Sequence, residues 1–421
     1  MRDRNHAGDK PEPDAVPDRR LGILGGGQLA KMLAEAALRQ GLQPVILVGS
    51  AADPAAIDGA EFIFGGLEEP AALSKVAARA GVLTIENEFL DLGLLGEVLD
   101  RHPSVQLRPG VESIAAAQDK LAQRRLFRRL DIAMPEYCPL HSASLPRDLT
   151  QVRKRFPEGF VLKWSRFGYD GRGNLAVTPG QKVNPKEIAD FCRRGEDRGA
   201  TIYAERRVDF DCELAMVSTR AADGDQVYFP LVISRQERGV CREVVGPAEA
   251  GGYDLDLERQ ARAIMRKIAE ELDLAGTFAV EFFLERDGRL LVNEMAPRVH
   301  NSGHYTLFDP EPSQFDLHVQ AVAGIPLSQP ALQGIGVMRN FLGPWDIRPG
   351  TPCTAPAEAP PAGTSLEWYG KQLVSPGRKM GHLSGRAPSF EAATDLLQAM
   401  AAYEDRFWDN LQEATIKEVR R

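Results

Sequence analysis

The chain has 421 residues, of which 43% are hydrophobic and 26% charged, and its formal net charge is −8 at pH 7. This length exceeds a single core of roughly 250–300 residues, so we expect two or three domains. The composition is typical of a folded globular protein, and the acidic balance argues against a nucleic-acid partner. Apolar runs such as 43–48 are far shorter than the roughly 20 residues that span a bilayer, which argues against a membrane protein.

The N-terminal segment and the cysteines point to a cytoplasmic protein. Residues 1–19 carry charges and prolines but no apolar stretch, so we interpret them as a disordered leader rather than a signal peptide. The five cysteines are scattered and contain no C-x-x-C pair, which argues against a disulfide framework and against a zinc site.

Alternating strands and helices are expected from residue 20 to about residue 118, and this order favours a parallel sheet flanked by helices. The first predicted elements are a strand at 21–24, a helix at about 28–39, a strand at 45–48 and a strand at 82–85. The last of these strands ends in an acidic pair, Glu86 and Glu88.

The turn Gly25-Gly26-Gly27-Gln28-Leu29-Ala30 matches the G-x-G-x-x-A form of a dinucleotide-binding turn. Glycines at such a turn let backbone amides approach an anion at the start of the helix. A dinucleotide site also needs an acid about 20 residues later, but the second strand ends in Gly49-Ser50. We therefore favour a phosphate over NAD at this turn, with a tight turn that binds nothing as the alternative.

The middle of the chain combines cations with a glycine-rich loop. An amphipathic helix is expected at 120–130, and the strand Phe160-Val161-Leu162 ends in Lys163. The loop from Gly168 to Gly173 contains three glycines and Arg172, so it could close over a triphosphate and exclude water. A surface hairpin is the alternative interpretation. Strands are then expected from 201 to 233, followed by a helix at about 257–272.

Two carboxylates are predicted to face each other across a later hairpin. A two-residue turn at Asp287-Gly288 between strands at 277–284 and 289–293 places Glu281 opposite Glu294. Apolar neighbours are expected on the same face, Ala279 and Phe283 beside Glu281 and Val292 beside Glu294. Like charges in such a setting either share a proton or hold a cation, and hard oxygen ligands suit Mg²⁺. We favour the metal.

Two further clusters carry cations and histidines. Arg298 and His300 follow the Glu294 strand within the run Arg298-Val299-His300-Asn301-Ser302-Gly303-His304, and their position favours an anion-binding or acid–base role over a structural one. After a proline-rich linker at 348–363, Lys371 and the turn Ser375-Pro376-Gly377-Arg378-Lys379 form a basic group, either a phosphate clamp or solvated charge.

Four segments together resemble one known family. They are the glycine turn at 25–29, the loop at 168–173, the run from Asn293 to His304, and Ser313-Gln314-Phe315. The combination resembles the 5-(carboxyamino)imidazole ribonucleotide synthetases, the ATP-dependent carboxylases of bacterial and fungal purine synthesis. The similarity extends over nearly the whole chain, from Arg20 to the stretch 377–383.

The resemblance implies an ATP-grasp fold, which combines α/β and α+β architecture. It divides the chain into a Rossmann-like domain at 20–118, an ATP-grasp domain at 119–328 with a lid at about 137–204, and a small C-terminal domain at 329–421. It also implies ATP and Mg²⁺ as cofactors, bicarbonate as co-substrate, 5-aminoimidazole ribonucleotide as acceptor, and a homodimer.

Site residues follow from the resemblance, position by position. The residues implied to bind ATP are Lys120, Lys163, Gly168, Tyr169, Asp170, Gly171, Arg172, Gly173, Asn174, Glu205, Val208, Glu213, Asn293 and Glu294. The metal ligands are Glu281 and Glu294. The residues implied to hold the ribonucleotide are Gln28, Tyr169, Asp170, Arg298, Asn301, Lys371 and Arg378. Arg298, His300 and Lys163 are the implied catalytic residues, the first two beside a carboxyphosphate.

The sequence departs from the family pattern after the strand that ends Pro230-Leu231. Members usually have an acidic residue or a histidine, then Asn, then His, where this chain has Ile233, Ser234 and Gln236. This departure puts one contact beside the nucleotide or metal in doubt. A second departure is mild, because Tyr305 replaces the family's tryptophan.

Three alternative functions are weighed against this one. Another ATP-grasp ligase, such as a formate-dependent glycinamide ribonucleotide transformylase, would share the nucleotide residues and differ in its acceptor. A Rossmann oxidoreductase is disfavoured by the missing acid after the second strand. A nucleotide-binding regulator without catalysis is disfavoured by the presence of Glu281, Glu294 and Lys163.

Overall fold

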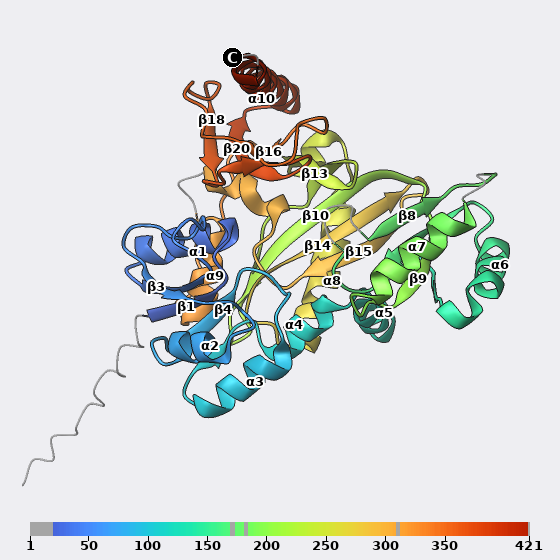
Figure 1. Ribbon diagram of the computed structural model, residues 1–421, viewed down its shortest axis with the longest axis horizontal. Helices are drawn as coiled ribbons and strands as arrows, with labels where there is room; N and C mark the ends of the chain where they lie inside the picture. The colour runs from blue at the N-terminus through green and yellow to red at the C-terminus, as the bar shows by residue number, and fades with distance from the viewer. Residues whose placement is uncertain (1–19, 169–172, 181–183, 309–311, 420–421) are drawn as a thin grey trace, which may run out of the picture.

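The computed structural model describes residues 20–168, 173–180, 184–308 and 312–419. The N-terminal domain lies beside a large central sheet, from which a smaller lobe projects on one side and the C-terminal strands extend on the other (Figure 1). The combined α/β and α+β fold expected from the sequence is confirmed. No helix among the described residues is long and apolar enough to cross a membrane. Residues 1–19, the expected leader, lie outside the described ranges.

The N-terminal domain is a five-stranded parallel sheet with the strand order β3-β2-β1-β4-β5. Its elements are β1 (Arg20–Leu24), α1 (Gln28–Arg39), β2 (Gln43–Val48), β3 (Glu61–Phe64), α2 (Pro70–Ala77), β4 (Val82–Ile85), α3 (Leu92–Arg101), β5 (Gln106–Leu107) and α4 (Val111–Gln118). The inner strands are almost continuously apolar because helices cover both faces of the sheet. The predicted βαβ unit is thereby confirmed.

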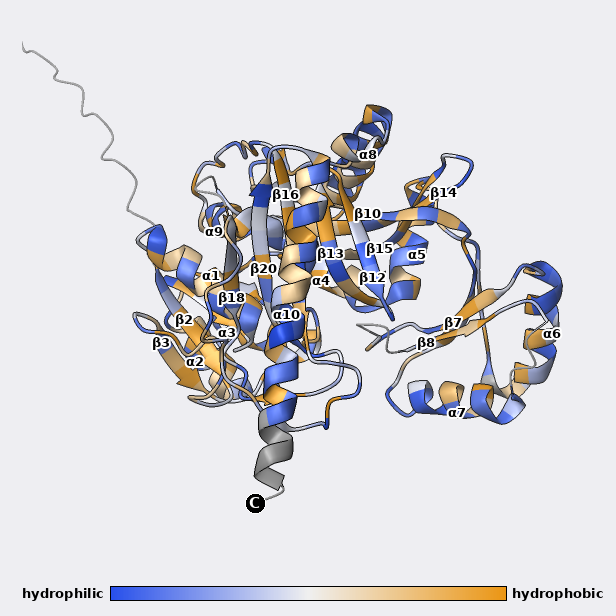
Figure 2. Cartoon of the chain, turned by 90° about the horizontal axis from the view of Figure 1, so that it is seen from above, coloured by the Kyte–Doolittle hydropathy of each residue, from blue (hydrophilic) through white to orange (hydrophobic). Residues whose placement is uncertain are grey.

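The lid is an antiparallel sheet of four strands in the order β6-β9-β7-β8, covered by two helices. Its elements are β6 (Tyr137–Pro139), α6 (Leu145–Arg155), β7 (Phe160–Trp164), β8 (Asn174–Val177), α7 (Pro185–Glu196) and β9 (Ile202–Arg206). It has its own hydrophobic core, in which Phe160, Leu162, Phe191 and Ile202 are buried. Figure 2 shows this lobe standing apart from the large sheet.

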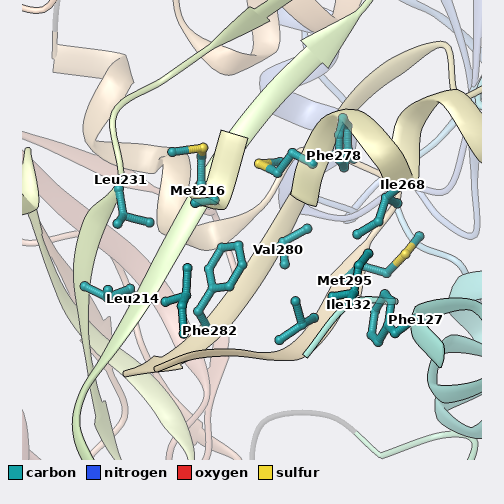
Figure 3. Close-up of a cluster of buried hydrophobic side chains, with 14 of the residues drawn as sticks. Phe127, Ile132, Leu214, Met216, Leu231, Ile268, Phe278, Val280, Phe282 and Met295 are labelled. Carbon is teal, nitrogen blue, oxygen red and sulfur yellow. The ribbon is translucent and has the colours of Figure 1, made fainter. Parts of the chain in front are cut away.

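The large sheet contains nine strands, eight of them in the order β15-β14-β10-β12-β13-β16-β20-β18, while β11 pairs with β10. The strands are β10 (Phe210–Arg220), β11 (Gln226–Tyr228), β12 (Val232–Glu237), β13 (Val240–Gly246), β14 (Gly276–Glu285), β15 (Leu290–Ala296), β16 (Ile335–Leu342), β18 (Thr364–Trp368) and β20 (Lys379–Ala387). Helices α5 (Lys120–Arg129) and α8 (Leu255–Glu271) cover one face and bury Phe278, Val280 and Phe282 (Figure 3).

Helix α9 (Gln314–Ala323) joins the N-terminal domain to the other face of this sheet. Phe315 packs with the N-terminal core, whereas Leu317 packs against strands β10 and β14. His318 of the same helix bonds to Thr84 Oγ1 at 2.7 Å and accepts from the Thr277 amide at 3.0 Å. Burial lowers the pKa of His318 to about 3, so its ring is a neutral link between the two domains.

Three of the C-terminal strands, β16, β20 and β18, continue the large sheet, whereas β17 (Thr351–Pro352) and β19 (Leu373–Val374) form a separate two-stranded sheet. β13 pairs with β16, and β20 and β18 follow outward. The predicted final helix is α10 (Phe390–Val419), which buries Leu397, Met400 and Tyr403 against these strands. The proline-rich segment at 348–363 contains β17, which pairs with β19.

The β14–β15 hairpin has a different register from the one assumed from its turn. The backbone amide of Glu285 donates to the carbonyl of Arg289, and the carbonyl of Glu285 accepts from the amide of Gly288. Residues 286–288 therefore form a three-residue loop, and Leu284 pairs with Leu290. A β-bulge at Asn293 then adds one residue, so Glu281 does pair with Glu294 as predicted. The predicted flank of Glu294 was wrong, because the bulge turns Val292 into the core beside Met295 and leaves Asn293 and Glu294 on the cavity side.

Candidate active site

Two cavities meet at the junction of the three parts of the molecule. The lid cavity, about 880 Å³, lies between the lid and the large sheet and is lined by Lys163, Glu205, Val208, Glu213 and Asn293 among others. The central cavity, about 330 Å³, lies between the N-terminal domain and the large sheet and is lined by Gln28, Arg298, His300 and Asn301 among others. Both are lined by Lys120, Gly168, Gln236, Gly239, Glu281 and Glu294. The carboxylate pair therefore stands where the cavities join.

A buried ion cluster forms the wall of the lid cavity. Glu205 on β9 accepts from Lys163 Nζ at 2.5 Å and from two nitrogens of Arg124 at 2.9 and 2.5 Å. Burial alone would raise the pKa of Glu205, but Arg124 and Lys163 outweigh it and hold the pKa below its usual value. Burial lowers the pKa of Lys163, and the neighbouring cations of Arg124 and Lys120 add to this, with Glu205 opposing them.

The junction itself carries an excess of carboxylates. Burial, Glu294 and Glu213 together raise the pKa of Glu281 to about 8. Burial also raises the pKa of Glu213, to about 7, with Lys163 opposing and Glu294 adding to the shift. Glu294 differs, because burial opposes ionisation but Lys120, whose Nζ lies 2.5 Å from its Oε2, holds the pKa at about 2.

The donor set at this junction fits Mg²⁺. Glu281 and Glu294 offer hard carboxylate oxygens, and the amide of Asn293 lies on the same side of the bulged strand. A cation between the two glutamates would remove the repulsion that raises the pKa of Glu281. The described residues contain no group of three or more His, Cys, Asp or Glu side chains that could hold a metal, so the remaining ligands would be water and ligand oxygens.

The run that follows β15 faces the central cavity. Arg298 Nε lies 2.6 Å from Glu88 Oε2, so the acidic pair predicted at the end of β4 supplies the partner of this arginine. His300 Nε2 lies 3.7 Å from Glu281 Oε1, which places the imidazole beside the junction. Asn301 exchanges amide hydrogen bonds with Asn340 of β16 at 2.9 and 2.6 Å.

The first glycine turn holds an anion that belongs to the chain itself. Glu86 accepts from the amides of Gly27 and Ala30 at 2.9 and 3.2 Å, at the start of α1. A Cβ atom on Gly25 or Gly27 would lie 2.5 or 2.6 Å from Glu86, so the glycines make room for this carboxylate. Two amides of the turn at which the sequence predicts a phosphate thus donate to Glu86 in the structure, and burial raises the pKa of this carboxyl group.

The other sequence-predicted residues are distributed as follows. Asn174 lines the lid cavity, whereas Gly173 packs against Trp164 and lines neither cavity. Lys371 donates to the carbonyl of Lys379 at 2.7 Å, and the exposed Arg378 donates to the carbonyl of Leu373 at 2.6 Å. Lys371 and Arg378 are absent from the described linings of both cavities. The expected loop residues Tyr169, Asp170, Gly171 and Arg172 lie outside the described residues.

Sequence reasoning missed several residues of the cavity walls. Lys379 belongs to the predicted basic turn but was not assigned to the site, and it lines the central cavity whereas Arg378 does not. Arg124 belongs to the predicted helix at 120–130 and lines neither cavity, but it is 1% exposed and bonds from behind to Glu205 in the wall of the lid cavity. The departures Ile233, Ser234 and Gln236 all line the lid cavity, so the altered pattern lies in the wall of the site.

Family models match three segments of the chain. A ribonucleotide synthetase preATP-grasp domain matches residues 19–118, and an ATP-grasp domain matches residues 125–315. A phosphoribosylaminoimidazole carboxylase C-terminal domain matches residues 336–395. These ranges correspond to the parallel sheet, the lid with the inner strands of the large sheet, and the outer strands of the large sheet with the first turns of α10.

Individual relatives cover nearly the whole chain. The N5-carboxyaminoimidazole ribonucleotide synthase of Synechococcus elongatus is 37% identical over 94% of this chain and 96% of its own length. The carboxyaminoimidazole ribonucleotide synthase of Aspergillus clavatus, solved with ATP, is 29% identical, has a TM-score of 0.80 and covers 93% of this chain and 100% of that chain. A second Aspergillus clavatus structure, with ADP and 5-aminoimidazole ribonucleotide, is 28% identical and has a TM-score of 0.77, and the match covers 93% of this chain and 100% of that chain. The chain belongs to the N5-carboxyaminoimidazole ribonucleotide synthase family of ATP-grasp ligases.

Proposed function

We propose that this chain transfers a carboxyl group from bicarbonate to the exocyclic amine of 5-aminoimidazole ribonucleotide at the expense of ATP, in purine biosynthesis. One observation carries the proposal: two cavities meet at Glu281 and Glu294, one lined by Lys163 and the other by Arg298 and His300. A reaction that links a triphosphate to a second substrate needs this arrangement, because the two substrates enter separately and react where the cavities join.

ATP occupies the lid cavity in this proposal. Lys163 and Lys120 neutralise its phosphates, the segment from Gly168 to Asn174 covers them, and Val208, Glu205 and Glu213 bound the nucleoside. Mg²⁺ held by Glu281 and Glu294 would neutralise developing charge on the phosphates. Relatives of the same fold solved with ATP and with ADP support nucleotide binding by this chain.

Bicarbonate lies at the junction, beside Arg298 and His300. An oxygen of bicarbonate attacks the γ-phosphorus of ATP, the bond to the β-phosphate oxygen breaks, and carboxyphosphate and ADP result. The guanidinium of Arg298, oriented by Glu88, stabilises the negative charge of carboxyphosphate. His300, beside Glu281, is placed to hold or move a proton there.

The ribonucleotide occupies the central cavity. Gln28, Asn301 and Lys379 line this cavity. Tyr169 and Asp170 are proposed to hold the ribonucleotide as well, and the basic turn with Lys371 and Arg378 to bind its phosphate together with Lys379. The amine nitrogen attacks the carboxyl carbon of carboxyphosphate, or of the CO₂ that it releases, while inorganic phosphate leaves and the amine loses a proton.

The homodimer and the cytoplasmic location belong to the same proposal. The five cysteines are all free in the structure, which suits a reducing compartment. Sedimentation equilibrium of the full chain tests the dimer, since a monomer mass at micromolar concentration would contradict it.

An acceptor assay tests the function. ADP release is measured with 5-aminoimidazole ribonucleotide or glycinamide ribonucleotide, each with bicarbonate or formate, and ¹³C-bicarbonate reports the product. We expect turnover and label incorporation with the aminoimidazole and bicarbonate. Turnover with glycinamide ribonucleotide and formate would instead establish the transformylase activity.

A further inference from the structure

The second histidine of the run Arg298 to His304 has no role in the mechanism above, yet it lines the central cavity. His304 lies in a 3₁₀ helix, Asn301–Phe308, and is 1% exposed. Its ring packs against His382 at 4.7 Å and Phe315 at 5.6 Å between centroids. The imidazole is thus held rigidly in the cavity wall.

Gln314, the first residue of α9, fixes the backbone of this segment. It is fully buried, its Oε1 accepts from the amide of His300 at 2.8 Å, and its Nε2 donates to the carbonyl of His300 at 2.7 Å. A backbone amide can only donate and a carbonyl can only accept, so these two bonds determine which end of the Gln314 amide is oxygen. A Cβ atom on Gly303 would lie 2.6 Å from that oxygen, which explains the glycine there.

The same amide determines the tautomer of His304. Gln314 Nε2 lies 3.0 Å from His304 Nδ1, and an amide nitrogen cannot accept a hydrogen bond, so Nδ1 carries no proton. A neutral ring then carries its proton on Nε2. Burial lowers the pKa of His304 well below its usual value, and the cations of Lys379 and Arg298 act in the same direction, so the ring is neutral.

We propose that His304 is a further substrate-binding residue, a neutral donor whose Nε2–H binds a lone pair of the ribonucleotide, and that Gln314 is the positioning residue that sets its tautomer. This inference rests on the proposed function. Arg298 and Lys379 already provide cations for anionic groups in the same cavity. An uncharged donor suits the unprotonated ring nitrogen of the aminoimidazole, because a cation there would withdraw electron density from the amine that must attack.

Steady-state kinetics test the substrate contact. His304→Phe keeps an aromatic ring between His382 and Phe315 but removes the donor, so we expect the KM for the aminoimidazole ribonucleotide to rise about five- to tenfold. The KM for ATP should stay within twofold. His304→Gln, which retains an N–H donor, should recover part of the loss.

The matched control is His318→Phe, since His318 is also a buried histidine but lines neither cavity. We expect lower thermal stability with both Michaelis constants unchanged. An unchanged KM for the ribonucleotide in His304→Phe, with an active parent enzyme, would overturn the inference and leave the proposed function standing. A parent enzyme that does not turn over the ribonucleotide would instead overturn the proposed function.

The tautomer is tested without any substrate. Long-range ¹H–¹⁵N spectra of the histidine-labelled full chain, assigned with His304→Phe, should show His304 protonated on Nε2. Gln314→Glu replaces the donating NH₂ by an oxygen, so His304 should shift its proton to Nδ1 and the KM for the ribonucleotide should rise as in His304→Phe. A parent His304 protonated on Nδ1 or on both nitrogens would overturn the role of Gln314.

Discussion

Glu205 and Glu281 are both enclosed carboxylates on the wall of the lid cavity, but their surroundings are opposite. Two cations of the chain itself, Arg124 and Lys163, surround Glu205 and keep its pKa low. Glu281 faces Glu294 and Glu213, and its pKa rises to about 8. The first carboxylate is therefore paired with cations of the chain itself, whereas the second has to take up a proton or a cation to relieve the repulsion from Glu294 and Glu213. Charge that the chain leaves unbalanced marks the reacting end of the site.

The largest effect on activity is expected at the carboxylate pair of Glu281 and Glu294. Glu294→Gln removes one oxygen of the proposed Mg²⁺ ligands and the partner of Lys120, so kcat should fall on the order of 10³-fold or more. The circular-dichroism melt should change little, because Glu294 lies at the cavity edge rather than in the core. Asp287→Asn at the exposed tip of the same hairpin is the control and should retain full activity. Full activity of Glu294→Gln with ordinary Mg²⁺ dependence would refute the metal assignment.

In the cluster around Glu205, substitutions should affect the free energy of unfolding most. Arg124→Met leaves Glu205 with one cation fewer in a buried setting, so the free energy of unfolding should fall by about 3–5 kcal/mol. Arg129→Met on the same helix breaks an exposed pair with Glu271 and should cost under about 1 kcal/mol. Urea denaturation of both variants gives the comparison, and equal losses would show that the Glu205 cluster is not a structural unit.

The pH dependence of stability sharpens the same contrast through Glu213. Its folded pKa of about 7 exceeds the usual 4.5, so the folded protein holds a proton that the unfolded chain has already released. The stabilising contribution is complete below pH 4.5, falls as the pH rises to 7 and stays constant above. Between pH 5 and pH 8 the free energy of unfolding of Glu213→Gln should therefore rise by up to about 2–3 kcal/mol relative to that of the parent. Urea titrations of both ligand-free proteins at pH 5 and at pH 8 measure this difference in unfolding free energy. A difference between variant and parent that is the same at both pH values would contradict the prediction.

The basic turn provides the smallest expected effect. Arg378 is exposed and donates to a backbone carbonyl, so its contribution to phosphate binding is expected at the lower end of charge-assisted bonds. Arg378→Ala should raise the KM for the ribonucleotide about tenfold and leave that for ATP unchanged. Lys379→Ala, on the cavity wall, should have at least as large an effect. If Arg378→Ala leaves both Michaelis constants unchanged, its charge is solvated surface; a rise for ATP alone would assign the turn to the other substrate.

The sequence predicted the long periodic elements well and the local irregularities poorly. Helix α1 and strand β4 have the predicted bounds because their apolar periods are strong and their ends are marked by glycines and acids. The pairing of Glu281 with Glu294 was predicted from an idealised turn, and a longer turn and a bulge compensate each other in the structure. Neither irregularity has a local signal, because the bulge at Asn293 depends on tertiary contacts such as the bond from Arg124 to its carbonyl.

The sequence also did not predict the hydrogen bonds and ion pairs between residues that lie far apart along the chain. Glu86 was identified at the end of its strand and the glycines at the start of their helix, but their sequence separation hid the hydrogen bonds that join them. The same holds for Arg298 with Glu88 and for Lys163 with Glu205. Residue types and their order indicate which groups belong to a site, whereas the pairing among those groups follows from how the sheets pack.

The continuous large sheet limits where the protein can be truncated or recombined with a relative. Residues Glu243–Gly246 of β13 pair along Gly336–Arg339 of β16, so a truncation before Ile335 would leave that edge of β13 without its neighbour. Uncovered strand edges are templates for aggregation. We expect such a truncated product to accumulate as inclusion bodies, and chimaeras between relatives to express well only when the exchanged segment carries β13 together with β16, β20 and β18.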